Sequence, residues 1–303
     1  MRVFLTGATG LIGRPLVQRL LDRGDVPLVL TRDSARAAEK MPGRVEFIQG
    51  DPNERGDWMR SLDGCDAVVN LVGEGVMARR WSAAQKQRLR DSRIDATRHV
   101  VEAMAAAASR PGVLVNASAT GYYGDVSEGD VTEDSPSGDD FLARLCVDWE
   151  AAARPAEELG ARVAWVRVGV VLDKRGGALS KMTTPFKLGV GGPVGNGRQW
   201  VSWIHLDDMV AAFLHALDRD EARGAINGTA PHPQRNREFS KSLARALHRP
   251  SLLPIPPFAL KLALGEVACV VTGGQKVLPA RLTAQGFSFR YPECDEAMRE
   301  IFS

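Results

Sequence analysis

Arg2-Val3-Phe4-Leu5-Thr6 leads directly into Gly7-Ala8-Thr9-Gly10-Leu11-Ile12-Gly13, and this stretch decides the fold. The first segment is a short apolar run rich in strand formers. The residues after the glycines place Leu16, Leu20 and Leu21 on one face of a helix. A helix N-terminus offers unpaired backbone N–H groups and the positive end of a dipole, so it attracts phosphate. The order of strand, glycine turn and helix therefore predicts a site for the pyrophosphate of a dinucleotide.

Each glycine of this turn has its own expected role. Gly7 permits the tight turn, Gly10 lets the backbone approach the phosphates, and Gly13 allows the helix to pack closely on the strand. The spacing is GxxGxxG rather than GxGxxG, but its place directly after a strand strengthens the interpretation. The predicted cofactor-binding residues of the turn are Gly7, Thr9, Gly10, Leu11, Ile12 and Gly13.

Strand-like and helix-like segments alternate through the first half of the chain. This alternation predicts the α/β class: a doubly wound parallel sheet, the Rossmann fold, covered by helices on both faces. The ligand cleft is then expected at the carboxyl ends of the strands. Further strands are expected at residues 27–31, 44–48, 66–71, 113–116 and 162–168. Helices are expected at residues 82–108 and 141–159, with shorter helix-compatible pieces at 35–40 and 58–62.

The texture of the sequence changes near Gly176, where frequent glycines predict a loop-rich stretch. Residues 1–175 are therefore assigned to an NAD(P)-binding Rossmann domain, with residues 200–230 returning to it. Residues 176–303 are assigned to a smaller C-terminal, substrate-side lobe. Within that lobe, Ile204-His205-Leu206-Asp207-Asp208 is expected to start a helix, with Asp207 or Asp208 as its cap or first-turn charge.

Composition and charge argue against several classes of partner. The chain has 303 residues, of which 44% are hydrophobic and 25% charged, so it can bury a sizeable core. A formal charge of +2 and scattered basic residues give no sign of nucleic-acid or membrane binding. The apolar stretch at residues 258–271 is interrupted by Lys261 and Glu266 and is too short to cross a membrane. The four cysteines lack metal-ligand spacing, so we expect no metal site and a cytoplasmic protein.

The end of the second expected strand bears on the choice of nucleotide. NAD sites usually place an acidic residue here to bind the ribose 2′-OH, whereas a guanidinium can bind a 2′-phosphate. Arg32 therefore favours NADP over NAD, although Asp33 beside it could turn inward instead. Asp51, after the third strand, is expected either near the adenine or as a helix cap. Leu71-Val72-Gly73-Glu74 is expected along the nicotinamide half of the cofactor.

These residues together resemble the extended short-chain dehydrogenases/reductases, the class that includes sugar-nucleotide epimerases and dehydratases. The resemblance covers most of the chain. It rests on residues 6–13, on Asn116-Ala117-Ser118-Ala119-Thr120-Gly121-Tyr122-Tyr123-Gly124-Asp125, on Arg167 and on residues 203–208.

The later sequence is similar to a narrower group within that class. Residues 273–282 and 286–292 resemble the short C-terminal domain, of unknown function, of an atypical epimerase-like family. Residues 91–97 also resemble that family. The resemblance implies that such a domain begins near residue 250.

The resemblance implies a catalytic serine, tyrosine and lysine, of which this sequence matches the serine. Ser118 corresponds to the residue that orients the substrate oxygen in the wider class. There, a tyrosine acts as acid or base and a lysine four residues later lowers its pKa. Aligning the helix through Glu150 puts Leu142 and Cys146 at these two positions, and Arg93 stands where the class has an asparagine. The usual Tyr-x-x-x-Lys pair is absent.

Proton handling would therefore fall to other residues. Tyrosine alone is a poor base at neutral pH, because its unperturbed pKa is about 10. Arg93 could supply the missing positive charge beside Tyr122 or Tyr123, while Cys146 is either a thiol acid or a small core residue. His205 has no serine or cysteine partner in a hydrolase motif and is interpreted as structural. The candidate catalytic residues are Ser118, Tyr122, Tyr123 and Arg93.

Two functions from different classes follow from these residues. The first is an NADP-dependent oxidoreductase or epimerase-like enzyme of unknown substrate, which the glycine loops around residues 195–200 favour. The second is a catalytically weak NADP(H)-binding or sensing protein, which the missing Tyr-x-x-x-Lys pair favours. The expected partner is a small-molecule substrate, and the long helix from Ser82 could pair two copies in a homodimer.

Overall fold

A sheet of seven parallel strands forms the centre of the computed structural model, which describes residues 1–41, 43, 45–251 and 254–303. Its strands are β1 (Arg2–Thr6), β2 (Val26–Thr31), β3 (Glu46–Gln49), β4 (Ala67–Asn70), β5 (Val113–Ala119), β7 (Arg162–Val168) and β11 (Gly224–Gly228). They lie in the order β11-β7-β5-β4-β1-β2-β3, so the winding reverses between β1 and β4. The predicted doubly wound topology is confirmed, and it gathers the carboxyl ends of the strands at one edge.

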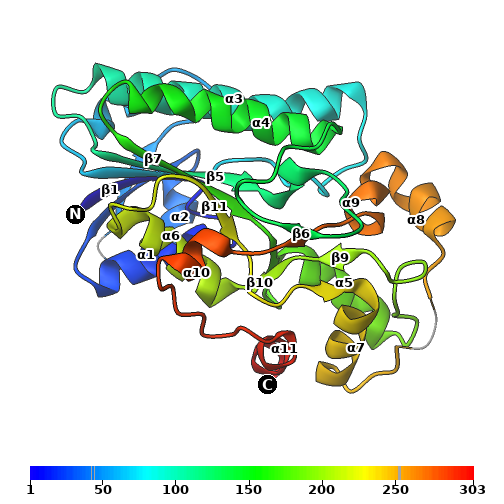
Figure 1. Ribbon diagram of the computed structural model, residues 1–303. Helices are drawn as coiled ribbons and strands as arrows, with labels where there is room; N and C mark the ends of the chain where they lie inside the picture. The colour runs from blue at the N-terminus through cyan, green and yellow to red at the C-terminus, as the bar shows by residue number, and fades with distance from the viewer. Residues whose placement is uncertain (42, 44, 252–253) are drawn as a thin grey trace.

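Helices cover both faces of this sheet (Figure 1). On one face, α3 (Ala83–Ala106) and α4 (Phe141–Ala153) lie side by side. The short 3₁₀ helices η1 (Asp57–Leu62) and η3 (Arg154–Glu157) pack with them. The other face carries α1 (Gly13–Asp22), α2 (Ser34–Lys40) and α6 (Leu206–Asp218). Within the described ranges, none of the helices is long and apolar enough to span a membrane.

Alternating side chains of β1 divide the core between these two faces. Val3 and Leu5 are fully buried with Leu16 of α1, whereas Phe4 points to the opposite face and packs in the cluster that contains Val100 of α3. This alternation follows from the two-residue period of a strand. Both faces of β1 are therefore apolar, as expected for the centre of a parallel sheet, and burial of this surface holds the helices in place.

A third hydrophobic core lies outside the sheet. It is formed among α5 (Gly177–Lys187), α7 (Asn236–Ala246) and α11 (Cys294–Phe302), around the fully buried Trp203 and Phe239. The other short helices are η2 (Thr120–Tyr123), α8 (Pro257–Leu264), η4 (Gly265–Ala268), α9 (Cys269–Thr272) and α10 (Ala280–Ala284). Three further strand pairs are β8 (Val170–Leu172) with β10 (Trp203–His205), β9 (Trp200–Val201) with β12 (Gln234–Arg235), and β6 (Asp130–Val131) with β13 (Lys276–Val277).

The boundaries of several elements differ from those expected from the sequence. Strand β5 continues to Ala119, because β7 pairs with it along its whole length. Strand β3 spans Glu46–Gln49, and residue 44, where a strand was expected to begin, lies outside the described residues. The helix expected at residues 141–159 is divided, since α4 ends at Ala153 and a 3₁₀ helix follows. Pro155, which lacks a backbone donor, lies in that 3₁₀ segment.

One expectation for the later part of the chain needs correction, and another is confirmed in one of its two alternatives, the first-turn charge. The glycine-rich stretch after Gly176 was expected to be loop, but it contains α5, whose interior Pro185 and flanking glycines hide it in the sequence. Helix α6 begins at Leu206 and is capped by neither aspartate. Its cap is His205, whose Nδ1 accepts from the Asp207 N–H at 3.1 Å, while Asp207 and Asp208 lie in the first turn.

A buried arginine joins the end of α6 to the edge of the sheet. The guanidinium of Arg162, in β7, donates to the carbonyl oxygens of Ala216, Leu217 and Ala222 at 2.6, 2.7 and 2.8 Å. Ala216 and Leu217 belong to the last turn of α6, where carbonyls lack partners within the helix. Arg162 therefore closes this helix end and fixes the chain that leads to β11.

Replacing Arg162 by Met should lower the free energy of unfolding by about 3 kcal/mol, because three buried carbonyls lose a charged donor. Urea denaturation followed by circular dichroism measures this change. Arg219→Met, at an exposed position just after α6, is the matched control and should change stability by less than about 0.5 kcal/mol. Equal effects of the two substitutions would contradict the role assigned to Arg162.

Candidate functional site

The glycine turn lies against the chain that follows β4. Gly7 has a φ of +64°, and a Cβ atom there would lie 2.6 Å from the carbonyl carbon of Leu71. Only glycine fits this conformation and this close approach. The Leu71 N–H donates to the Thr6 carbonyl at 3.2 Å, which ties the two segments together. The structure thus brings the predicted pyrophosphate turn and the start of the predicted nicotinamide segment to one edge of the sheet.

Gly10 and Gly13 differ in what surrounds them. A Cβ atom at Gly13 would lie 2.5 Å from Ala8 Cα, so this glycine lets α1 pack on the turn. At Gly10 the nearest atom of the described chain beyond its neighbours would be the Gly7 carbonyl oxygen, at 3.1 Å, and the remaining space is open. Helix α1 also starts without a side-chain cap at Ile12. An open space before uncapped N–H groups fits a pyrophosphate.

The ends of β2 and β3 carry two aspartates whose carboxylates bind their own backbone turns. Asp33 accepts from the Arg36 N–H at 3.0 Å and caps α2. Asp51 accepts from the backbone and side-chain amides of Asn53, at 2.9 and 2.8 Å. Arg32, which directly precedes Asp33, is exposed. Asp33 is thus bonded to the start of α2, and Arg32 is an exposed positive charge at the end of β2.

Helix α3 fastens the segment that follows β4. The Glu74 N–H donates to Ser92 Oγ at 3.2 Å, and its carboxylate accepts from Gln85 Nε2 at 2.9 Å. The Glu74 carbonyl accepts from Arg93 Nη2 at 2.7 Å. A Cβ atom at Gly73 would lie 3.1 Å from Arg93 Cζ, so the guanidinium packs directly against this glycine. Arg93 is therefore in contact with the predicted nicotinamide segment.

Arg93 is a buried cation held by carbonyl groups. It is 8% exposed, and its Nη1 donates to the Leu89 carbonyl at 3.0 Å. Its Cζ lies 5.1 Å from the centroid of the Trp149 ring. Among the described residues no carboxylate lies within ion-pair distance of it. Burial lowers the pKa of Arg93 from its ordinary value, while Cys146 and Glu74 act in the opposite direction.

A buried ion pair lies at the carboxyl end of β5. Glu150 of α4 and Arg167 of β7 are 7% and 4% exposed, and Arg167 donates to both carboxylate oxygens at 2.8 and 2.9 Å. Ser118, at the end of β5, donates from its Oγ to Glu150 Oε1 at 2.7 Å. The Ser118 hydroxyl is thus buried and bonded to the ion pair, a partner that the sequence did not indicate.

Tyr122 and Tyr123 contact the same arginine in different ways. Arg167 Cζ lies 3.4 Å from the centroid of the half-buried Tyr122 ring. The Tyr123 hydroxyl accepts from Arg167 Nη1 at 2.9 Å and donates to Asn227 Oδ1 at 2.6 Å. Burial raises the pKa of Tyr123 to about 12. Tyr123 is a neutral hydroxyl bonded within the core, and Tyr122 is the more accessible of the two.

Cys146 occupies the position that the family resemblance assigns to a lysine. It is buried on α4, and burial raises the pKa of its thiol to about 12. A Cβ atom at Gly121 would lie 4.0 Å from the Cys146 sulfur and 3.4 Å from Leu142 Cβ, so α4 packs closely on η2. These are the surroundings of a core residue, and the thiol is uncharged near neutral pH.

A buried polar network beneath these residues was missed in the sequence. Thr6 donates to Asn70, and Asn70 Nδ2 donates to Asn116 Oδ1 at 2.6 Å and to Thr97 Oγ1 at 2.9 Å. Trp149 Nε1 also donates to Thr97, at 3.0 Å. The available signal in the sequence was the polar residue that follows each apolar run. Only the register, with Asn70 opposite both Thr6 and Asn116, shows that they meet.

A segment from late in the chain reaches the loop after β5. Gln275 Nε2 donates to the Thr120 carbonyl at 2.7 Å, and the Gly274 N–H donates to Asp125 Oδ1 at 2.9 Å. A Cβ atom at Gly274 would lie 2.0 Å from the Trp200 carbonyl oxygen, so a larger residue would clash with backbone. Nothing in the sequence pattern pointed to Gln275 as a neighbour of the candidate site.

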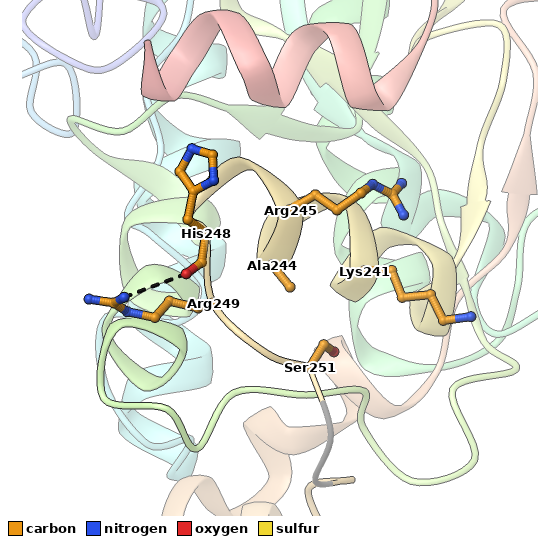
Figure 2. A pocket seen from close by; sticks show the side chains of 6 residues that line it. All are labelled: Lys241, Ala244, Arg245, His248, Arg249 and Ser251. Atoms are coloured by element: carbon orange, nitrogen blue, oxygen red, sulfur yellow. Dashed lines mark hydrogen bonds between the residues drawn. The ribbon is translucent and has the colours of Figure 1, made fainter.

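A separate hollow of about 480 Å³ lies at the C-terminal end of α7. Figure 2 shows the charged ends of Lys241, Arg245 and Arg249 pointing away from this hollow. Arg245 pairs instead with Asp295, at 2.6 and 2.7 Å. Because no polar groups of the described chain converge on it, this hollow is a weaker candidate for a ligand site than the strand ends.

The described residues contain no group of three or more His, Cys, Asp or Glu side chains arranged to hold a metal.

The fold and the glycine turn define the class of this protein: a doubly wound α/β protein of the Rossmann type. Two family profiles match its sequence, the "NAD dependent epimerase/dehydratase family" over residues 3–227 and the "Domain of unknown function (DUF1731)" over residues 255–301. The chain belongs to the NAD dependent epimerase/dehydratase family, and the resemblance drawn from its sequence is confirmed.

Relatives of high similarity extend over the whole chain. An Arabidopsis thaliana protein named "Epimerase family protein SDR39U1 homolog, chloroplastic" is 46% identical over 303 residues, covering 99% of this chain and 86% of its own. Epimerase family protein SDR39U1 of Bos taurus is 37% identical, with 100% of both chains covered. The crystal structure of human SDR39U1 (isoform 2) with NADPH superposes with a TM-score of 0.89 at 36% identity, covering 100% of this chain and 99% of that one.

Replacing Glu150 by Gln should lower the free energy of unfolding by about 3 kcal/mol, because it leaves the Arg167 guanidinium buried without its counter-charge. The measurement is urea denaturation near neutral pH. Asp148→Asn on the same helix is the control, since Asp148 is 43% exposed and its ion pair with Arg90 lies at the surface. That substitution should cost less than about 1 kcal/mol. A Glu150→Gln protein as stable as the control would refute the importance of the buried pair.

Proposed function

We propose that the chain binds NADP(H) and acts as an NADP-dependent oxidoreductase or epimerase-like enzyme on a small-molecule substrate. The observation that carries the proposal is the open space at Gly10 in front of the uncapped start of α1, which suits a pyrophosphate. The use of Asp33 as a helix cap supports NADP over NAD, because it leaves Arg32 at the place where a 2′-phosphate would lie. The NADPH named for the human relative's structure supports the same choice.

The proposed cofactor-binding residues lie in several loops, each of which would contact a different part of the dinucleotide. The backbone of Thr9, Leu11 and Ile12 would hold the pyrophosphate at α1. Arg32 would bind the 2′-phosphate, and Asp51 would lie near the adenine. The segment from Leu71 to Glu74 would border the nicotinamide half, a role supported by its contact with the glycine turn.

The chemistry would take place between the loops that follow β4 and β5. NADPH, when bound, supplies a hydride from its nicotinamide ring. Ser118 would orient the substrate oxygen, and Tyr122 would supply the proton. Arg93 would stabilise negative charge on that oxygen, since a guanidinium stays protonated at neutral pH. Tyr123, with its hydroxyl bonded to Arg167 and Asn227, would hold these residues in place and would not contact the substrate.

A specific observation favours the second function, a catalytically weak NADP(H)-binding or sensing protein. The hydroxyls of Ser118 and Tyr123 are both buried and already bonded to the Glu150–Arg167 pair or its neighbours. The thiol of Cys146 is buried and uncharged. If Tyr122 does not donate a proton, no acid from the predicted set remains for turnover.

The proposal also includes the predicted division of the chain. Residues 1–175, with a return at residues 200–230, would bind the cofactor, and residues 176–303 would form the substrate side. The position of α6 and β11 in the layers of the main sheet supports the return. Pairing of two copies into a homodimer through the region of α3 stays a prediction, as does the cytoplasmic location.

Replacing Arg32 by Ala should weaken NADPH binding by about tenfold to a hundredfold, because a charged hydrogen bond to the 2′-phosphate is lost. NADH binding should change little, since NADH lacks that phosphate. Isothermal titration calorimetry with both cofactors measures the difference. Arg36→Ala, at an exposed site on α2, should leave both affinities near those of the parent. Equal affinities of the parent for NADPH and NADH would rule out the specificity proposed here.

Turnover should depend on the loops after β4 and β5. With a panel of aldehydes and ketones and saturating NADPH, Ser118→Ala, Tyr122→Phe and Arg93→Met should each lower kcat/KM by at least about tenfold, or about 1.4 kcal/mol. Cys146→Ala should have little effect, and Tyr123→Phe should mainly lower stability. NADPH oxidation at 340 nm is the readout. Loss of turnover in Cys146→Ala alone would make the thiol the acid, whereas tight NADPH binding without turnover of any compound would favour the second function.

A further inference from the structure

Arg93 forms no ion pair with any residue that the structure describes. Its bonds go to the carbonyls of Leu89 and Glu74 and, at 3.5 Å, to Ser92 Oγ, all of which are neutral acceptors. The Glu74 carboxylate instead accepts from Gln85 Nε2 and is not within ion-pair distance of the guanidinium. The Cys146 thiol beside it is uncharged at neutral pH, because burial raises its pKa to about 12. The guanidinium is therefore a buried cation without an ion-pair partner among the described residues, and the Glu74 carboxylate acts on it only from beyond ion-pair distance.

This charge lies directly behind the loop that would border the nicotinamide ring. Gly73 is exposed and has no side chain, and a Cβ atom there would lie 3.1 Å from Arg93 Cζ. On its other side the guanidinium faces the Trp149 ring. A charge in such a buried setting is screened far less than one at the surface.

We propose that Arg93 makes the site discriminate between the redox states of the cofactor, so that NADPH binds more tightly than NADP⁺. This inference rests on the proposed function, in which the segment from Leu71 to Glu74 borders the nicotinamide half. The oxidised nicotinamide ring carries a positive charge that the reduced ring lacks, and the phosphates and riboses of the two forms are the same. A fixed cation behind Gly73 repels the oxidised ring and leaves the reduced ring unaffected.

The discrimination has a thermodynamic consequence for the bound cofactor. Tighter binding of the reduced form raises the reduction potential of the bound couple, by about 30 mV for each tenfold of preference in this two-electron couple. Bound NADPH is then a weaker hydride donor than free NADPH. Arg93 would favour retention of the reduced cofactor until a substrate oxygen arrives that the same guanidinium can stabilise.

The test compares the dissociation constants of NADPH and NADP⁺ for the parent and for Arg93→Gln, by calorimetry and by NADPH fluorescence. Glutamine removes the charge and keeps an amide donor for one of the two carbonyls. The parent should bind NADPH at least about tenfold more tightly than NADP⁺, and Arg93→Gln should reduce this ratio to within about threefold. Arg93→Lys, which keeps the charge, should preserve most of the preference.

The matched control is Arg98→Gln on the same helix, where the exposed guanidinium pairs with Asp95, and its ratio should equal that of the parent. Equal affinities of the parent for the two redox states overturn the inference, whether or not the variants fold. An unchanged ratio in folded Arg93→Gln, or an equal fall in Arg98→Gln, overturns it too. If the parent binds neither form, the proposed function fails instead, so the two failures are distinguishable.

Discussion

The buried pair of Glu150 and Arg167 is the interaction on which the surrounding structure depends. Two charges taken out of water must be matched to one another, and each remaining donor or acceptor needs a partner. Ser118 and Tyr123 meet this requirement with their hydroxyls, and Asn227 extends the network to the edge strand of the sheet. The ends of β5, β7 and β11 and the last turn of α4 are thereby held in one arrangement, and Tyr122 is positioned by stacking on the same guanidinium.

Local patterns in the sequence predicted the parts of the fold that local physics decides. The apolar runs of the sheet strands and the glycine turn at residues 7–13 can be recognised from adjacent residues alone. The doubly wound sheet was therefore predictable. Helix α5 was not, because packing of Leu179 and Phe186 into a core with α7 and α11 overrides its glycines and proline. The cap of α6 was missed because histidine rarely serves as an N-cap, although His205 does so here.

Candidate residues for the site could be named from the sequence, whereas their hydrogen-bond partners could not. Ser118, the two tyrosines and Arg93 could be named from the sequence, but the partner of Ser118 lies 32 residues away and that of Tyr123 lies 104 away. The family's lysine and this chain's Arg93 also differ in the helix from which they supply a positive charge. The resemblance places a cation on α4, where this protein has the neutral Cys146, and the cation that acts on that thiol, Arg93, comes from α3 instead.

The contact of Gln275 with the Thr120 carbonyl spans 155 residues of chain, which bears on how the molecule is made. A contact of such long sequence separation closes late, because the entropy of ordering the intervening chain must first be offset. During synthesis from the N-terminus, the sheet strands up to β7 are available well before residue 275 emerges. The loop after β5 therefore receives one of its supports only when most of the polypeptide exists. In a nascent chain the glycine turn can therefore form while the loop after β5 still lacks this support.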